Sequence, residues 1–558
     1  HKEDMSTPPL LTLQHLYGHF WPPDRVVTGI LTCKVIREQL LNQAEDVFLC
    51  TKEAVNAQET GTSDIINDLE RFQHKMVTFG IELNEANVVI NAFKHSNRLA
   101  LVNKLIHRGD NGRNMKWGER ETATMTQIIS QCHNLSHLDI KGSLLPAEQS
   151  WTILGNALKG CLGLRYLDLG GTRPLNRGRG DGSDIQSVTC AISQMTCLTH
   201  LSLDCNALND AGTETLGAAL GNCPSLTFLN LSDNWGGGTT ANNNLQRTLQ
   251  CCTVLKELIL SAFPFNETNL PLLHSLQSCT SLSRLDMSKA KMVLSPTALY
   301  SDCSKISSVK DLDLSTFDDL QFLPDFMQKF DSVTNLNISY SKIGTKTIKA
   351  ICMALTPPRF PSCITGLNLE GNIINNLGAA SIATILETHP CLTSLNIKNN
   401  VLCNDGARRL AAELPKCSKL TSLNMNNNQI GVAGACALAS ALAPLAALRE
   451  LDLGNNPLAD QGATALSTSL TGCTRLKTIV LTGTSIQVQG AATFIRSAQD
   501  NCPELELLAL DNNDFADDSD PLLLPLLGGW WRSRTQRVRL ILTEGAGRRR
   551  ECEDGEEE

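Results

Sequence analysis

The frame L-x-x-L-x-L, filled by leucine and other aliphatic residues, starts fourteen times between residues 135 and 510. Its clearest run starts at Leu392, Leu420, Leu448 and Leu476, so that successive starts lie 28 residues apart. Apolar and polar positions alternate within each frame, which predicts a short strand whose leucines share one face. A fixed period of this length predicts a stack of similar repeats and not a set of separate globular domains.

A second apolar pattern, with spacings of three and four residues, follows the frames and predicts one helix in each repeat. Residues Gly406–Leu414 and Ala433–Leu442 are examples, and their alanine and glycine allow the helix to lie close to the strands. Because the helix layer is wider than the strand layer, the stack should curve, with its strands on the concave face. The expected fold is therefore α/β, a horseshoe solenoid of about 14 strand–helix repeats.

The rhythm of the frames is uneven in two places. An insertion at residues 170–183 lengthens one spacing to 34 residues, and the spacings between Leu282 and Ile364 are 27, 24 and 31. We expect shorter helices and altered curvature in this central stretch. The frames begin at Leu135, Leu164, Leu198, Leu226, Leu255, Leu282, Val309, Val333, Ile364, Leu392, Leu420, Leu448, Leu476 and Leu505.

Many frames continue into x-x-N, which places an asparagine in the turn after the strand. A side-chain amide at this point can bond the backbone groups of the turn. We therefore expect an asparagine ladder along the solenoid, formed by Asn206, Asn234, Asn372, Asn400, Asn428, Asn456 and Asn513.

The two ends of the chain depart from the repeat, and three regions are predicted. Residues 1–120 should form a small all-α N-terminal region, with helices over roughly 10–20, 24–50, 63–78, 83–96 and 97–107. Residues 121–542 should form the solenoid, closed by a degenerate helix at 521–532 and a strand at 538–542 that cap its end. Residues 543–558 are highly charged and should be a disordered tail.

The chain carries a formal net charge of −9, and only 4% of its residues are aromatic. Both values argue against nucleic acid or an anionic membrane as the main ligand. The longest apolar stretch is far shorter than a membrane span, and residues 1–11 do not resemble a signal peptide. The expected location is cytoplasmic or nuclear.

Eleven of the 21 cysteines follow the repeat. Eight of them lie three residues before the first leucine of a frame, and three lie one residue before it. A disulfide framework or a C-x-x-C zinc site would not be expected to follow this spacing, so we predict reduced, structural thiols and no metal. The two sets are Cys132, Cys161, Cys223, Cys252, Cys279, Cys417, Cys473 and Cys502, and then Cys197, Cys363 and Cys391.

Sequence motifs of catalysis are absent. The chain has no G-x-x-x-x-G-K-[ST], G-x-S-x-G, H-E-x-x-H or EF-hand sequence, so we expect no catalytic residues, no cofactor and no enzymatic activity. The insertion does carry Arg173, Arg177 and Arg179, which could act as an arginine finger in GTP hydrolysis. The other interpretation of this basic loop is a simple interaction epitope.

The middle position of L-x-L is Asp or Asn in ten of the fourteen frames. These residues could form a polar, acid-tinged surface for a basic partner, or they could bond between neighbouring strands, and we favour the second interpretation. The more variable neighbouring positions are better candidates for partner binding, because aromatic and arginine side chains make the strongest anchors. The candidates on the concave face are His137, Tyr166, His200, Phe228, Glu257, Arg284, Arg449 and Glu450.

The frame of 28 to 29 residues, with a cysteine before the strand and Gly-Ala at the helix start, resembles ribonuclease-inhibitor-like leucine-rich repeats. Proteins with similar repeats include ribonuclease inhibitors, Ran GTPase-activating proteins, NOD-like receptors and F-box proteins. The resemblance covers about two thirds of the chain and implies a fold, but it does not imply one function.

Residues 11–41 also resemble an F-box, a short helical module that begins with L-P-x-E and ends with V-C-K-x-W-R. The chain departs from the pattern at Thr12, Gln14 and Ile36, and a plain helical cap of the solenoid is the alternative. The resemblance implies docking onto the adaptor of a cullin-RING ubiquitin ligase. The matching positions are Leu11, Leu16, Phe20, Pro23, Asp24, Cys33, Lys34 and Arg37.

Together these patterns predict a non-catalytic scaffold that binds a protein partner on its concave face, with no nucleic acid or membrane as partner. The most specific version is the substrate receptor of an SCF-type ubiquitin ligase. The alternative is a Ran-type GTPase-activating protein or another regulator of a small GTPase.

Overall fold

The computed structural model describes residues 47–50, 77–80, 102–106, 115–147, 149–172, 185–208, 210–234, 239–266, 270–293, 305–316, 323–357, 363–514, 522–523 and 539–542. The chain divides into two compact units. Unit 1 comprises His1–Ile259 and Pro271–Leu282, and unit 2 comprises Leu260–Leu270 and Ser283–Glu558.

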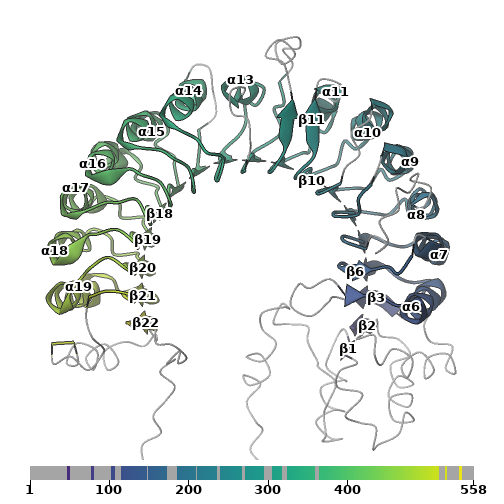
Figure 1. Cartoon of the computed structure of the whole chain (residues 1–558), viewed down its shortest axis with the longest axis horizontal. Coiled ribbons are helices and arrows are strands. Elements are labelled where there is room, and N and C mark those ends of the chain that lie inside the picture. The colour runs from purple at the N-terminus through teal and green to yellow at the C-terminus, as the bar shows by residue number, and fades with distance from the viewer. Residues whose placement is uncertain are drawn as a thin grey trace, which may run out of the picture. The chain divides into compact units, whose positions relative to one another are not determined.

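Unit 1 has a main layer of parallel strands with a layer of helices packed behind it (Figure 1). Strands β4 (Met115–Lys116) and β6 (Ser143–Leu144) form a separate two-stranded sheet. Each helix contacts the next one along the chain. In sheet order the strands are β1 (Val47–Cys50), β2 (Val77–Gly80), β3 (Val102–Ile106), β5 (His137–Asp139), β7 (Tyr166–Asp168), β8 (His200–Ser202), β9 (Phe228–Asn230) and β10 (Glu257–Ile259). The helices are α6 (Glu119–Gln131), α7 (Gln149–Leu158), α8 (Gln186–Ile192), α9 (Asp210–Leu220) and α10 (Thr239–Cys251).

Unit 2 repeats the same two-layer arrangement. Its parallel strands are β12 (Arg284–Asp286), β14 (Asp311–Asp313), β15 (Asn335–Asn337), β16 (Gly366–Asn368), β17 (Ser394–Asn396), β18 (Ser422–Asn424), β19 (Glu450–Asp452), β20 (Thr478–Val480), β21 (Leu507–Ala509) and β22 (Arg539–Ile541). Its longer helices are α14 (Thr345–Leu355), α15 (Asn376–Thr388), α16 (Cys403–Glu413), α17 (Val432–Leu442), α18 (Ala459–Ser469) and α19 (Val488–Asn501).

The core of both units is built from the frame residues. Each of the fourteen predicted frames contains a strand, and its aliphatic residues point away from the strand face toward the helices. In the frame that starts at Leu420, for example, Leu420, Leu423 and Met425 are at most 1% exposed. The sequence prediction of an α/β solenoid is therefore confirmed.

The expectation of a purely helical N-terminal region is wrong for the described residues. Strands β1, β2 and β3 lie within or overlap three of the predicted helices, and they continue the parallel sheet outward from β5. Each begins with a valine, and β-branched side chains favour extended backbone. The edge of β5 offers unpaired backbone groups, and pairing with a further strand satisfies them.

The expectation of shorter helices between Leu282 and Ile364 holds for α13 (Leu323–Met327) but not for α14, and the short helix α11 (Leu270–Ser275) lies just before this stretch. Helices α11 and α13 contain 6 and 5 residues, whereas α14–α19 contain 11 to 14. Phe263 and Ala290 occupy the position of the ladder asparagine on either side of α11. The turns that follow pair instead through the backbone, as strands β11 (Pro264–Asn266) and β13 (Lys291–Val293).

The asparagine ladder is present as predicted. The Oδ1 atom of Asn400 accepts a hydrogen bond from the N–H of Ile374, and its Nδ2 group donates to the carbonyls of Leu369 and Ile397. The same amide therefore joins two neighbouring turns, and Asn234, Asn372, Asn456 and Asn513 bond in the same way. In Asn428 the Nδ2 group donates to the carbonyls of Ile397 and Met425, but the buried Oδ1 atom has no hydrogen-bond partner.

Most of the cysteines that follow the repeat are free, and the eight that lie three residues before the first leucine of a frame are all buried. In several repeats the thiol donates to a carbonyl of the preceding repeat; the Sγ atom of Cys417, for example, lies 3.5 Å from the Leu386 oxygen. Burial raises the pKa of Cys417 to about 11, so the thiol is protonated.

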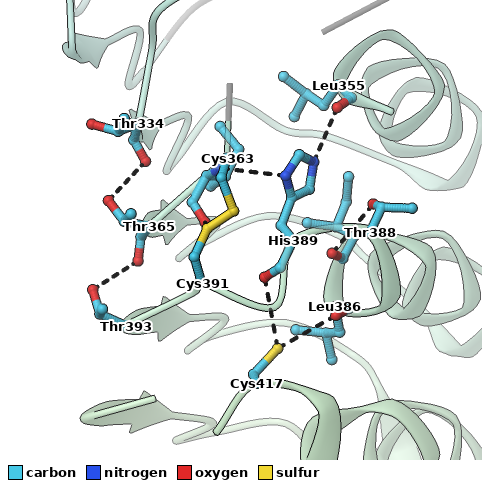
Figure 2. Close-up of a disulfide and its surroundings, with 12 residues drawn as sticks. Thr334, Leu355, Cys363, Thr365, Leu386, Thr388, His389, Cys391, Thr393 and Cys417 are labelled. Atoms are coloured by element: carbon cyan, nitrogen blue, oxygen red, sulfur yellow. Dashed lines mark hydrogen bonds between the residues drawn. A yellow bond between two sulfur atoms is a disulfide. The ribbon is translucent and has the colours of Figure 1, made fainter. Parts of the chain in front are cut away.

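One pair of cysteines corrects the expectation that all thiols are reduced. Cys363 and Cys391 form a disulfide between adjacent repeats, with 6.4 Å between their Cα atoms (Figure 2). They occupy the same position in two successive frames, and in-register parallel strands bring such positions together. A disulfide can therefore follow the repeat period, contrary to the prediction.

His389 takes the place of the buried cysteine beside this disulfide. Its Nε2 atom lies 3.0 Å from the Leu355 carbonyl oxygen, and its Nδ1 atom accepts from the N–H of Ile364 at 3.3 Å. Because a carbonyl oxygen can only accept, the ring is the neutral tautomer with hydrogen on Nε2. Burial lowers the pKa of His389, which keeps it neutral.

Stability should consequently fall with pH below about 6.5, the ordinary histidine pKa. Between that value and the lower folded pKa, the unfolded chain binds a proton that the folded chain does not bind. Replacing His389 with cysteine restores the residue of other repeats and removes this group. We expect wild type to lose about 1 kcal/mol more than His389→Cys between pH 7.5 and 5.5 in urea unfolding.

The comparison with His389→Cys is needed because other groups titrate in the same range. Burial raises the pKa of Asp168 to about 6, so the folded chain binds the extra proton there and the effect has the opposite sign. Equal pH dependence of the two proteins would contradict the assignment to His389.

Candidate interaction surface

The strand face of unit 1 presents one row of side chains from the first outward position of consecutive strands. The strands pair in register, so residues that are about 30 positions apart in sequence become lateral neighbours. In sheet order, from β3 to β10, this row is Lys104, His137, Tyr166, His200, Phe228 and Glu257.

Four members of this row, His137, Tyr166, His200 and Phe228, form one continuous stack, which we call the ring ladder. Successive ring centroids are 3.9, 4.0 and 3.8 Å apart, with interplanar angles of 10°, 11° and 6°. All four side chains are half-buried. Because each inner ring is covered on both faces, the ladder presents mainly ring edges to a partner.

The ring ladder is uncharged at its centre. Burial between neighbouring rings lowers the pKa of His200 to about 4; Asp139 opposes this shift and Lys141 adds to it. His200 is therefore neutral at neutral pH, and the ladder combines an apolar body with polar ring nitrogens and a phenol. Side chains of this kind, held in place before binding, are typical anchors of protein interfaces.

The second outward position of β5 and β7 carries an aspartate whose carboxylate is buried. Asp139 and Asp168 are 0% and 6% exposed. Each accepts a hydrogen bond from the backbone N–H two residues later, at 3.2 Å from Lys141 and 2.8 Å from Gly170. Their role here is to close the turn after the strand, which agrees with the structural interpretation of this position.

Asp204 lies at the ends of the same strands and is 8% exposed. It accepts hydrogen bonds from the Nζ atom of Lys141 at 3.2 Å, the Oγ atom of Ser202 at 2.6 Å and the Nδ2 atom of Asn230 at 3.2 Å. No cluster of His, Cys, Asp or Glu suited to a metal ion occurs among the residues that the structure describes.

The Asp and Asn residues at the middle position of L-x-L were predicted to bond between neighbouring strands, but most of their hydrogen bonds lie within one turn. In unit 2, the Oδ1 atoms of Asp313, Asn337 and Asn396 accept from the backbone two residues later, as in unit 1. A bond between neighbouring strands occurs as well, from the Nδ2 atom of Asn337 to Asp313 at 2.8 Å. The side chains therefore bond within their own turns more often than between strands.

The remaining predicted contact residues lie in unit 2. Arg284 and Glu450 occupy the first outward position of β12 and β19, and Arg449 precedes β19. All three are exposed, and Glu450 accepts from the Oγ atom of Ser422 at 2.9 Å. The central strands β15–β18 carry small hydroxyl and amide side chains. A threonine directly precedes each of them, and Thr334, Thr365, Thr393 and Thr421 form a chain of hydrogen bonds, of which Figure 2 shows the first three residues.

Two groups of predicted residues lie outside the described part of the chain. The first is the F-box-like segment with Leu11, Leu16, Phe20, Pro23 and Cys33. The second is the arginine-containing insertion with Arg173, Arg177 and Arg179. Both remain predictions.

Comparison with protein families agrees with the repeat architecture. A model described as leucine-rich repeat matches residues 194–217, 416–439 and 447–467, each of which covers a strand and most of the following helix. Among solved structures, the chain is similar to an internalin from Listeria monocytogenes at 17% identity and a TM-score of 0.36, over 76% of this chain and 89% of that one. A search of curated proteins found no match.

The chain therefore carries leucine-rich repeats within an α/β solenoid fold. Within the described helices, none is long and apolar enough to cross a membrane.

Proposed function

We propose that this protein is a non-catalytic scaffold that binds a protein partner on the strand face of unit 1. The observation that carries the proposal is the ring ladder. Leucine-rich-repeat proteins generally bind other proteins on such faces. Aromatic residues make up only 4% of the chain, so the grouping of Tyr166 and Phe228 with two histidines concentrates the best anchor residues in one place.

The physical advantage of the ladder lies in its rigidity. Each inner ring is fixed between two others, so little side-chain entropy is lost when a partner covers the ring edges. The equivalent row of unit 2 includes Gly366, Ser394 and Ser422, which bury little area on binding. We therefore place the main anchor in unit 1, and Arg284, Arg449 and Glu450 are secondary candidates.

The proposal can be tested by comparing partner recovery from cells by two variants of the full chain. The variant Tyr166→Ala/Phe228→Ala removes two rungs, and Ser394→Ala/Ser422→Ala changes the same position of unit 2. We expect the first to lose proteins that wild type and the control retain, measured by quantitative mass spectrometry. Identical recovery by all three folded proteins would reject the ring ladder as a binding site.

We further propose, from the sequence resemblance of residues 11–41, that the scaffold is a substrate receptor of an SCF-type ubiquitin ligase. In that role the N-terminal segment would dock onto a cullin-RING adaptor while the ring ladder selects the substrate. Deleting residues 8–45 should abolish co-purification of the adaptor, and Tyr166→Ala/Phe228→Ala should leave it intact. Failure of wild type to co-purify the adaptor would remove this version and leave the scaffold proposal standing.

The other version, a regulator of a small GTPase, rests on Arg173, Arg177 and Arg179 alone. No feature of the described residues favours it over the receptor. If the protein stimulated GTP hydrolysis by a Ran-like GTPase, and replacing these arginines removed the stimulation, the GTPase regulator would be favoured over the receptor.

A further inference from the structure

The accessible charges around the ring ladder are mainly basic, although the whole chain is acidic. Arg165 directly precedes Tyr166 and is exposed, and Lys256 occupies the same position three strands away and is also exposed. We call the residues that directly precede the strands the N-terminal edge. Among the described residues of unit 1, the turns that lead into this edge, from 132–136 to 252–256, carry no acidic side chain.

The other sides of the ladder add two more cations. Lys104 continues the row beyond His137, and Lys141 is 48% exposed at the opposite end of the strands. The exposed or half-exposed carboxylates nearby are Glu257 and Asp233. The other acids, Asp139, Asp168 and Asp204, are at most 8% exposed and hydrogen-bonded, so they are poorly placed to meet a partner.

We infer that the partner segment recognised by the ring ladder is acidic and apolar, with carboxylates that pair with Arg165 and Lys256. This inference rests on the proposed function and names the chemistry of its ligand. It reverses the sequence-based alternative of an acidic face for a basic partner, because the structure buries Asp139 and Asp168, the acidic residues at the middle L-x-L position of unit 1.

The spacing of the two cations defines the segment more closely. Three strand spacings separate β7 from β10, which places the backbone positions of Arg165 and Lys256 about 14 Å apart. An extended peptide advances about 3.3 Å per residue, so two carboxylates four residues apart span this distance. The side chains between them would then lie over Tyr166, His200 and Phe228.

A protein segment fits this surface better than a nucleic acid does. Single-stranded nucleic acids bind by stacking bases on free aromatic faces, and the faces of the inner rings are already covered by other rings. Ring edges and a phenol suit the varied apolar and polar groups of a peptide.

The test is selection of a random 12-residue peptide library, displayed on phage, against the full chain. Peptides that also bind Tyr166→Ala/Phe228→Ala are removed. We expect the remaining peptides to carry Asp or Glu on both sides of aromatic or aliphatic residues. Their affinity should fall at least tenfold for Arg165→Glu/Lys256→Glu and recover when the peptide carboxylates are changed to lysine.

The matched control is Lys310→Glu/Lys419→Glu, which reverses two exposed cations in turns that lead into strands of unit 2 and should bind as wild type does. Ladder-dependent peptides that are neutral or basic, or that ignore the charge reversal, would overturn the acidic partner and leave the proposed function intact. Recovery of no ladder-dependent peptide would overturn both. Binding of a 20-nucleotide single strand that both unit 1 variants abolish would also overturn the inference, in favour of nucleic acid.

Discussion

Replacing Asn456 with alanine is expected to lower the free energy of unfolding by about 4 kcal/mol. The Asn456 side chain is 0% exposed, and its Oδ1 atom accepts from the N–H groups of Asn428 and Ile430 at 2.9 and 3.0 Å. Its Nδ2 group donates to the carbonyls of Met425, Leu453 and Gly454 at 3.0, 2.9 and 3.1 Å. Alanine removes the partner of the Asn428 and Ile430 N–H groups and of the Leu453 carbonyl, and each of these three groups costs somewhat more than about 1 kcal/mol. The carbonyls of Met425 and Gly454 keep a second donor, Asn428 Nδ2 and the Asn427 N–H.

The measurement is urea unfolding followed by far-ultraviolet circular dichroism, with hydrogen exchange to locate the effect. Each repeat contacts only its neighbours, so faster exchange should be confined to the turns near residues 425–456. The matched control is Asn455→Gly. Asn455 is exposed, has φ = +55° and donates one side-chain bond, and glycine accepts this backbone conformation. A loss no larger than that of the control would contradict the structural role of the ladder.

The strands and the asparagine ladder could be predicted from sequence because both follow from the period. Burial of Leu420, Leu423 and Met425 is a local pattern that each repeat shows again. Strands β1–β3 escaped prediction because they lack the full frame, and short apolar runs do not distinguish a strand from a helix. Their pairing depends on the edge that β5 provides, which is a tertiary effect.

The ring ladder was predicted only in part. Its four residues were named one by one as candidates, but their stacking requires in-register pairing across an insertion between β7 and β8. Aligning the frames would have revealed that all four occupy the third frame position. The same alignment places Cys363 and Cys391 in successive frames at one position, but Cys132 and Cys161 have the same relation and are free. The alignment alone therefore does not identify the disulfide.

Other features leave no signal in the sequence of a single repeat. The Oδ1 atom of Asn404 accepts from the N–H groups of Gly431 and Gly434, and Asp460 accepts from Gln487. In each case a side chain of one helix caps the helix of the next repeat. The basic character around the ladder is of the same kind, because it depends on which charges the structure buries.

Replacing Tyr166 with alanine is expected to weaken binding of the partner recovered with wild type about 30-fold or more, the size of a central interface anchor. Tyr166 stacks on both His137 and His200, so its loss also opens a gap inside the ladder. Each stacking contact stabilises the fold by about 1 kcal/mol, and unfolding should therefore become easier by about 2 kcal/mol.

A series along the ladder separates stacking from other effects. Tyr166→Phe keeps the ring and removes only the hydroxyl, so it should retain affinity within about threefold if its hydroxyl contributes less than 1 kcal/mol. His137→Ala removes a terminal rung that stacks on one ring in the ladder, and its effect should lie between the two. Isothermal titration calorimetry on the folded variants provides the comparison. If Tyr166→Phe weakened binding as much as Tyr166→Ala, the phenol hydroxyl and not the stacked ring would be the anchor, and the ladder would serve only to position it.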